Sequence, residues 1–595
     1  MNTKTINDMV IRFANVNGSG SASANDMFAK SVFRMGIPVS PKNIFPSNIQ
    51  GLPTWFDVRI SEKGYLGRRE GIDVLVAVNP ATMKKDIESV LPGGYLIYDS
   101  SKVLHEDYIR EGIHYIGIPM MAMVMEHYSV PRLQQLFKNM VYVGALIALL
   151  DMEMEVTRNI VKETFAKKEK LVPPNFQALD LGYNYAKENY DCPINFCVKR
   201  ADKIGNKIMM EGNAAIGLGA VYGGATVMAW YPITPSTSVA KAFETYCKKL
   251  RIDPQTGKKN YAFVQSEDEL AAIGMVIGAA WNGARAFTAT SGPGVSLMSE
   301  FIGLAYFAEI PAVIVNVQRG GPSTGMPTRT QQPDILSSAY ASHGDTKHML
   351  LFPSTPAECF EFTAQAFDLA DYFQTPVFIM SDLDLGMNEH LSPPLKWDDS
   401  RKYNLGKVMS AEDLETKEFG RYLDVDGDGV CYRTIPGTHP TKGSFFTRGT
   451  SRDEYAQYSE NGQVYVNVVN RISKKWQTAK SHVPAPEFYQ KENESKQGIV
   501  FFGTTTYAAL EAMDILEGHG RKWDAMRVRA FPFNQEVADF IASHEKVFVI
   551  EQNKDAQFRS LLINELEVNP KKLEPVLVYD GKPITATAII DKLMN

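Results

Sequence analysis

Four apolar runs in the middle of the chain each end in a polar loop rich in glycine, proline or hydroxyl residues. The runs read ATVMAWY (225–231), YAFVQ (261–265), RAFTATS (285–291) and AVIVNVQ (312–318), and their loops read YPITPS, QSEDE, TSGPG and QRGGPSTG. Short apolar runs that alternate with helical patterns predict parallel strands joined by helices. Because parallel strands end at one edge of their sheet, the four loops are expected to meet there and form a ligand site.

The same alternation is predicted on both sides of this region. Strands are expected at 9–16, 72–80, 94–100, 113–120, 348–352 and 376–382, and again in the last hundred residues, with a buried helix at 132–150. We predict an α/β, multidomain chain with doubly wound, mostly parallel sheets. The domains would be 1–190, a linker at 191–205, 206–395, an irregular connecting region at 396–495, and 496–595. The charged, proline-containing stretch KKEKLVPPN (167–175) also reads as a linker.

Composition excludes several classes of protein. A length of 595 residues is too great for one hydrophobic core, and a net charge of −6 argues against a nucleic-acid partner. The longest apolar run, MVYVGALIALL (140–150), is about half of the ~20 residues that a membrane span needs. The five cysteines are scattered without CxxC spacing, which indicates reduced thiols in a cytoplasmic protein and no iron–sulfur cluster in this chain.

Two glycine-containing motifs resemble ligand sites only in part. NGSGSASA, with Gly18 and Gly20, follows a strand and opens a helix, but Ser23 stands where a dinucleotide fingerprint has its third glycine. It is either a structural turn or a contact for a phosphate or coenzyme. DVDGDGVCYR (424–433) begins like a calcium loop, but position twelve is Ile435, and it lacks the apolar strand that precedes a thiamine-diphosphate GDG motif. A solvated turn is the better interpretation.

The four central loops contain no metal-ligand cluster, CxxC or Ser–His pair, so their chemistry must come largely from a bound cofactor or a partner. The loops themselves carry a resemblance. YPITPST, QSEDELAAIGMVIGAA, TATSGPGVSLMSE and QRGGPSTGMPTRTQQPD closely resemble the alpha subunits of 2-oxoacid:ferredoxin oxidoreductases. The 2-oxoglutarate type with a gamma domain fused in front is the most similar. IFPSNIQGLPTWFDVR and KNMVYVGALIALL look like that gamma domain, although NGSGSASA departs from its usual GxGGQG.

The resemblance implies a thiamine-diphosphate-binding, pyrimidine-type fold between a gamma domain and a transketolase C-terminal-like domain. It implies thiamine-dependent oxidative decarboxylation of 2-oxoglutarate to succinyl-CoA and CO2, with coenzyme A as co-substrate and ferredoxin as electron acceptor. The diphosphate would be shared with a beta subunit, which would hold Mg2+ and [4Fe-4S] clusters. We expect a dimer of heterodimers that is active only with its beta subunit and does not bind membranes or nucleic acid.

By the same resemblance, Glu267 is the catalytic glutamate that faces the aminopyrimidine N1′ of the cofactor. Thr234 and Arg319 would hold the 2-oxo carboxylate, since a guanidinium fork suits that group. Pro232 and Pro235 would stiffen the loop and present the Thr234 hydroxyl at low entropic cost. Further cofactor contacts would come from the other loop residues, Ile233, Ser291 and Gly292. Arg329 is the candidate for the distal carboxylate of 2-oxoglutarate, or it pairs locally.

Three alternatives remain open. The first keeps the chemistry and changes the substrate to a branched-chain or other 2-oxoacid. The second is an NAD(P)-linked oxidoreductase that uses the NGSGSASA turn, and the third is a noncatalytic scaffold subunit whose loops bind a partner.

Overall fold

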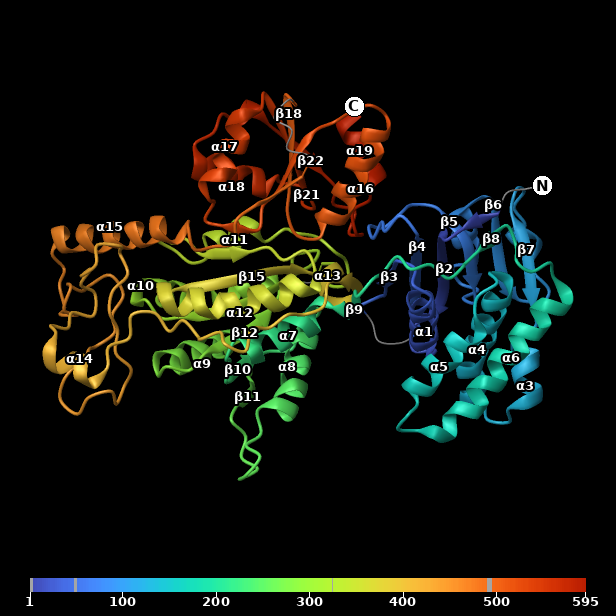
Figure 1. The fold of residues 1–595 in the computed structure, drawn as a ribbon, viewed down its shortest axis with the longest axis horizontal. Helices are drawn as coiled ribbons and strands as arrows, with labels where there is room; N and C mark the ends of the chain where they lie inside the picture. The colour runs from blue at the N-terminus through green and yellow to red at the C-terminus, as the bar shows by residue number, and fades with distance from the viewer. Residues whose placement is uncertain (1–3, 48–50, 324, 490–494, 595) are drawn as a thin grey trace. The chain divides into compact units, whose positions relative to one another are not determined.

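The computed structural model describes residues 4–47, 51–323, 325–489 and 495–594. Residues 48–50 of the IFPSNIQGLPTWFDVR motif and Thr324 of the QRGGPSTG loop lie outside the described residues. The chain divides into two compact units (Figure 1). The N-terminal unit comprises Met1–Met209, Asn388–Pro393 and Thr585–Thr587, and the C-terminal unit comprises the remainder.

The N-terminal unit is built on a six-stranded sheet with strand order β3-β4-β2-β5-β6-β7. Strands β2 (Asp8–Val16), β5 (Ile72–Ala77), β6 (Val90–Asp99) and β7 (His114–Ile118) are parallel neighbours, as the alternating pattern predicts. Strands β3 (Val39–Ile44) and β4 (Pro53–Ser61) extend the sheet antiparallel. Helices α1 (Ser21–Arg34), α3 (Met120–His127) and α5 (Met154–Thr164) belong to the same unit.

Two long helices form the interior of the N-terminal unit. The predicted buried helix is α4 (Pro131–Leu149), whose residues 139–149 are all buried. It packs on α6 (Val172–Asn189), and a Cβ atom on Gly144 or Gly182 would lie about 2 Å from a main-chain carbonyl oxygen of the other helix. The prediction of a linker at 167–175 is wrong. Its prolines occupy the first turn of α6, where the missing N–H costs nothing.

The C-terminal unit contains the seven-stranded sheet β11-β10-β12-β13-β15-β14-β20. All of its strands are parallel except β20 (Ala530–Phe531), which pairs antiparallel with β14. The parallel strands are β10 (Val227–Trp230), β11 (Ala262–Gln265), β12 (Ala286–Thr290), β13 (Ala312–Gln318), β14 (Met349–Leu351) and β15 (Pro376–Asp382). The connecting helices include α7 (Gly212–Tyr222), α8 (Thr237–Leu250), α9 (Glu269–Trp281), α10 (Gly292–Ala308) and α12 (Pro356–Phe373).

The chain from β17 onward adds a five-stranded sheet in the order β17-β19-β18-β21-β22. Strands β18 (Gln497–Phe501), β19 (Asp524–Arg527), β21 (Lys546–Glu551) and β22 (Leu573–Leu577) are parallel, and β17 (Glu487–Tyr489) is antiparallel. Helices α16 (Thr505–Gly518), α17 (Gln535–Ser543) and α18 (Gln557–Leu566) accompany it. Both sheets of this unit share one hydrophobic core.

The region expected to be irregular contains two helices and the short strand β17, while most of its other described residues form turns and loops. Its last segment forms α15 (Gly462–Ala479), an 18-residue helix that buries Val468, Ile472 and Trp476 along one side. Asn461 caps this helix by accepting hydrogen bonds from two main-chain N–H groups. The prediction of an irregular connection over 396–495 is therefore wrong for α15 and for the short helix α14 (Ala411–Thr416).

A buried ionic cluster fixes this region to the end of α10. The Glu309 carboxylate is 1% exposed and accepts hydrogen bonds from Arg452, Arg471 and Lys475. Arg421 donates to the main-chain carbonyl of Glu309 at 2.8 Å. Burial opposes ionisation of Glu309, but the surrounding cations hold its pKa well below the usual value. The Glu309 carboxylate thus holds three basic side chains, and its main-chain carbonyl holds a fourth.

The DVDGDG turn is held by ion pairs within the protein. Lys407 lies 2.7 Å from an Asp426 oxygen and 2.8 Å from an Asp428 oxygen, and Asp424 accepts a hydrogen bond from the Gly429 N–H. In the part of the chain that the structure describes, no group of three or more His, Cys, Asp or Glu side chains is arranged to hold a metal ion. Across the same residues, no helix is both long and apolar enough to span a membrane.

Candidate active site at the carboxyl edge of the seven-stranded sheet

The four predicted loops follow four neighbouring strands. Strands β11, β10, β12 and β13 lie next to one another in that order and are parallel, so their carboxyl ends share one edge of the sheet. The structure therefore brings the loops with Thr234, Glu267, Ser291 and Arg319 to the same edge. This arrangement follows from strand order, which the sequence alone did not give.

The YPITPS loop is fixed by its own hydroxyl groups. The Ile233 carbonyl accepts hydrogen bonds from Thr237 Oγ1 at 3.1 Å and Ser236 Oγ at 3.2 Å, and the Ile233 N–H donates to Thr237 Oγ1. Asn213 Nδ2 donates to the Pro235 carbonyl at 2.9 Å. Thr234 is exposed at the top of this held loop. The loop is thus a rigid support with Thr234 on its outer side.

Arg319 connects the loop after β13 to the YPITPS loop. The side chain is 6% exposed, and its Nη1 donates to the Thr234 carbonyl at 2.5 Å while Nη2 donates to the Ser323 carbonyl at 3.2 Å. Burial lowers the pKa of the Arg319 guanidinium. Its Nε is buried and has no hydrogen-bond acceptor among the described residues. A buried guanidinium with a free N–H suits an anionic ligand.

Glu267 lies between β11 and α9 and is exposed. The helix is capped by its neighbour Asp268, whose carboxylate accepts a hydrogen bond from the Ala271 N–H at 2.7 Å. Because Asp268 caps the helix, Glu267 is not needed for that purpose. Its carboxylate is therefore available to a ligand or a partner.

Ser291 and Gly292 form the tight turn from β12 into α10. Ser291 is the N-cap residue but makes no side-chain capping bond, and its buried hydroxyl has no hydrogen-bond partner among the described residues. A Cβ atom on Gly292 would lie 2.4 Å from an oxygen of Asp334, so a larger residue there would displace the Asp334 side chain. Neither Asp334 nor Asn316, which donates to it, was singled out from the sequence; the signal was a pair of polar residues, Asn316 and Gln318, inside a buried strand.

Arg329 belongs to the same loop as Arg319. The Gly320 N–H donates to the Arg329 carbonyl at 2.9 Å, which closes the loop between the two arginines. The Arg329 side chain is half-buried, burial lowers its pKa, and Nη1 bonds to the carbonyl and hydroxyl of Thr328. The local pairing expected for this arginine is thus present.

The NGSGSASA motif forms a turn in the N-terminal unit. Gly18 and Gly20 have φ of 85° and 78°, and Gly20 precedes the first residue of α1. A Cβ atom on Gly20 would lie 2.2 Å from the Leu136 side chain. These two requirements explain both glycines without a ligand.

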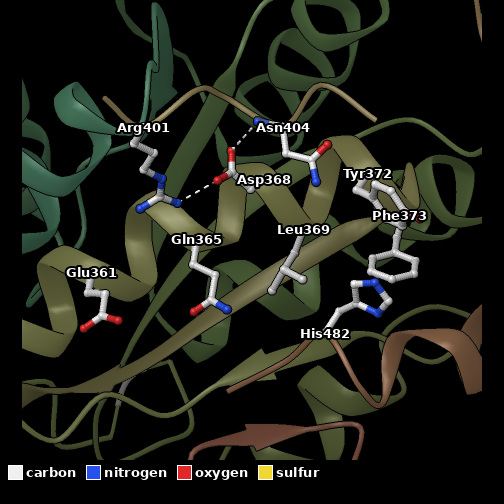
Figure 2. A pocket seen from close by; sticks show the side chains of 9 residues that line it. All are labelled: Glu361, Gln365, Asp368, Leu369, Tyr372, Phe373, Arg401, Asn404 and His482. Carbon is white, nitrogen blue, oxygen red and sulfur yellow. Dashed lines mark hydrogen bonds and ion pairs between the residues drawn. The ribbon is translucent and has the colours of Figure 1, made fainter. Parts of the chain in front are cut away.

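A separate groove lies on the outer side of α12 (Figure 2). Its volume is about 310 Å³, the Asp368–Arg401 ion pair lies on one side, and Tyr372, Phe373 and His482 gather at one end. None of the predicted site residues lines this groove. It is built on the helix that leads into the amino-terminal end of β15, away from the carboxyl edge.

Comparison with known proteins identifies relatives over nearly the whole chain. Residues 218–477 match the family described as pyruvate flavodoxin/ferredoxin oxidoreductase, thiamine diphosphate-binding, and residues 10–185 match pyruvate ferredoxin/flavodoxin oxidoreductase. Subunit alpha of 2-oxoacid:ferredoxin oxidoreductase 2 from Aeropyrum pernix is 29% identical over 95% of this chain and 94% of its own length. The 2-oxoglutarate synthase subunit KorA of Methanothermobacter thermautotrophicus is 47% identical over 31% of this chain and 47% of its own.

A solved structure has the same fold. It is the 2-oxoglutarate:ferredoxin oxidoreductase from Magnetococcus marinus with 2-oxoglutarate, coenzyme A and succinyl-CoA bound. Its TM-score is 0.88 at 29% identity, and the alignment covers 99% of both chains. The expected α/β class and the expected resemblance are thereby confirmed.

Proposed function

We propose that this chain, which belongs to the alpha subunits of the 2-oxoacid:ferredoxin oxidoreductases, takes 2-oxoglutarate as its substrate. The reaction would be thiamine-dependent oxidative decarboxylation to succinyl-CoA and CO2 with reduction of ferredoxin. Support for this substrate comes from the ligands in the Magnetococcus marinus structure and from the names of the KorA relatives, while other relatives are named only for 2-oxoacids.

The observation that carries the proposal is the contact between Arg319 and Thr234 at the carboxyl edge of the sheet. It places a buried cation with an unpaired N–H beside the main chain of Thr234, an exposed loop residue that carries a hydroxyl. A 2-oxoacid presents a carboxylate next to a keto oxygen, and these two groups match one cation and one neutral donor. Arg329, closed onto the same loop, is our candidate for the second carboxylate of 2-oxoglutarate.

The same edge fits thiamine diphosphate. Glu267 is exposed and does not cap the helix, and the buried Ser291 hydroxyl at the start of α10 has no hydrogen-bond partner among the described residues. We assign Glu267 to a contact with the aminopyrimidine of the cofactor. Further contacts with the cofactor would come from Ile233, Ser291 and Gly292. When bound, thiamine diphosphate would supply the electron sink that stabilises the negative charge left by loss of CO2. Glu267 would hold the proton at the pyrimidine, and Arg319 would orient the substrate carboxylate.

A beta subunit is the partner that we propose for this edge. Beside the exposed Thr234 and Glu267, helices α9 and α10 expose four large apolar side chains, namely Leu270, Met275, Leu297 and Leu304, which are 38–52% exposed. A cluster of exposed apolar side chains next to catalytic groups favours a covering subunit. That subunit would carry Mg2+ and the [4Fe-4S] clusters, and two such pairs would form the enzyme.

The experiment measures anaerobic viologen reduction with 2-oxoglutarate and coenzyme A, for the chain alone and co-expressed with the beta gene. Activity only in the pair, faster with 2-oxoglutarate than with pyruvate or 2-oxoisovalerate, is the expected result. Preference for another acid would refute the substrate, and activity of the isolated chain would refute the shared site.

A further inference from the structure

Asp334 lies at the carboxyl edge of the sheet and has no role in the reaction described so far. It follows the QRGGPSTGMPTRTQQP loop and directly precedes α11 (Ile335–Ala339). Two side chains of β13 hold it there. Asn316 Nδ2 donates to a carboxylate oxygen of Asp334 at 3.2 Å, and Gln318 Oε1 accepts from the Asp334 N–H at 3.1 Å. Its position is thus set by β13, the strand that Arg319 directly follows.

The other side of the Asp334 carboxylate faces the turn that begins α10. A Cβ atom on Gly292 would lie 2.4 and 2.5 Å from the two carboxylate oxygens. Gly292 is the first residue of α10, where the positive end of the helix dipole favours a negative charge. The carboxyl group therefore packs between the turn proposed for the cofactor and the strand that carries the substrate arginine.

Among the described residues, Arg319 is the charged side chain that affects the Asp334 carboxyl group, and its positive charge favours the ionised form. The side chains that hold Asp334 in place are neutral. Asn316 of β13 donates to its carboxylate and to Ser338 of α11, and Gln318 of β13 accepts from its main-chain N–H. Burial raises the pKa of Asp334 to about 6, against the opposing effects of the Asn316 hydrogen bond and the Arg319 charge. The group can therefore change its charge within the pH range in which an enzyme is assayed.

We propose that Asp334 is a positioning residue that couples the Gly292 turn to Arg319 and sets the affinity for the 2-oxoacid. In its ionised form Asp334 draws on the charge of Arg319 and competes with the carboxylate of the substrate. In its protonated form it leaves that charge to the substrate, while its volume still supports the Gly292 turn. This inference rests on the proposed role of Arg319 and concerns substrate affinity, not the chemical step.

The test uses the assembled complex and the 2-oxoacid that it turns over fastest. The KM for this acid should rise about tenfold between pH 5 and pH 8 in the wild type, because ionised Asp334 weakens the attraction of Arg319 for the substrate carboxylate, while kcat follows a different profile. Asp334→Asn keeps the shape without the charge, so its KM should stay low and nearly constant over the same range. Asp334→Ala removes the volume of the side chain as well as its charge, so the Gly292 turn loses its support. This variant should therefore also lower kcat and the retention of the cofactor.

Asp382→Asn is the matched control. Burial also raises the pKa of Asp382 to about 6, but its carboxylate bonds to Gln332 and Thr504 instead of facing Gly292. This variant should keep the wild-type dependence of KM on pH. The proposal is overturned if the wild-type KM is constant from pH 5 to 8, or if Asp334→Asn keeps the wild-type profile. A wild-type pair that turns over no 2-oxoacid would instead refute the proposed function.

Discussion

Arg319 donates a hydrogen bond to the main-chain carbonyl of Thr234, 85 residues earlier in the chain. The two residues come from loops after β10 and β13, which are separated in the sheet by β12. Their contact joins two separate sequence motifs in one binding surface. Replacement of either residue therefore also tests the role of the other.

Replacement of Arg319 should impair substrate binding most. We expect Arg319→Ala to lower kcat/KM by at least about 100-fold, because a hydrogen bond to a charged group is worth about 1.5–3 kcal/mol and the substrate carboxylate loses its cation as well. Arg319→Lys should recover only part of this, since lysine lacks the planar fork. Steady-state kinetics of the complex measure the effect. Arg401→Ala, at the α12 groove, is the control and should leave kcat/KM unchanged.

Replacement of Glu267 should affect the chemical step. Glu267→Gln keeps the shape of an exposed side chain that does not cap α9, so the melting temperature should stay within about 1 °C of wild type. We expect kcat to fall about 100-fold or more, as for loss of a group that handles a proton. Glu244→Gln on α8, which breaks a surface ion pair with Lys248, should leave kcat unchanged. Full activity of Glu267→Gln would support the scaffold alternative.

The docking of the five-stranded sheet should depend on pH through Glu358. Arg527 of β19 bonds to both of its carboxylate oxygens, at 2.6 and 2.7 Å. Burial alone opposes ionisation, but Arg527 and Arg529 lower the pKa of Glu358 to about 2. Since the folded pKa is below the ordinary value of 4.5, this stabilisation is present above pH 4.5 and is lost as the pH falls toward 2. The contribution of ionised Glu358 to the free energy of unfolding is of the order of 3 kcal/mol.

Melting curves between pH 7 and pH 3 measure this effect. Glu358→Gln should lower the melting temperature at pH 7 and flatten its decline toward low pH. Glu361→Gln, exposed on the same helix, should follow the wild type at every pH. A wild-type decline that survives in Glu358→Gln would show that other carboxylates control acid unfolding.

Loss of the Glu309 carboxylate should loosen residues 396–479. Glu309→Gln leaves Arg452, Arg471 and Lys475 buried without a counter-charge, and breaking a buried ion pair in this way costs about 3–5 kcal/mol. Limited proteolysis of the isolated chain should cut this region faster than in wild type. Glu300 is exposed on the same α10, so Glu300→Gln should give the wild-type cleavage pattern. Equal rates of cleavage in Glu309→Gln and Glu300→Gln would contradict the prediction.

The strands were predictable because each combines an apolar run with a turn signal, and the loops at their ends followed from that. The strand order that joins Thr234 to Arg319 depends on long-range packing, so the sequence could only suggest a shared edge. Helix α6 was missed because Pro173 and Pro174 were interpreted as a break, when they occupy a first helical turn. Helix α15 did carry a signal, since Val468, Ile472 and Trp476 recur every four residues. Asp334 required the structure, because its contact with Gly292 crosses 42 positions of the chain.

The N-terminal unit is assembled from three stretches of chain, since Asn388–Pro393 and Thr585–Thr587 belong to it as well as Met1–Met209. The middle stretch contains β16 (Glu389–Ser392), and Glu389 forms an ion pair with Lys30 of α1 at 3.2 Å. A gene divided after codon 209 would therefore encode a first polypeptide that is incomplete and a second that contains the whole of the C-terminal unit. The first would lack two pieces of its own fold, and the second would carry them. The two products would therefore need to associate to complete the N-terminal unit.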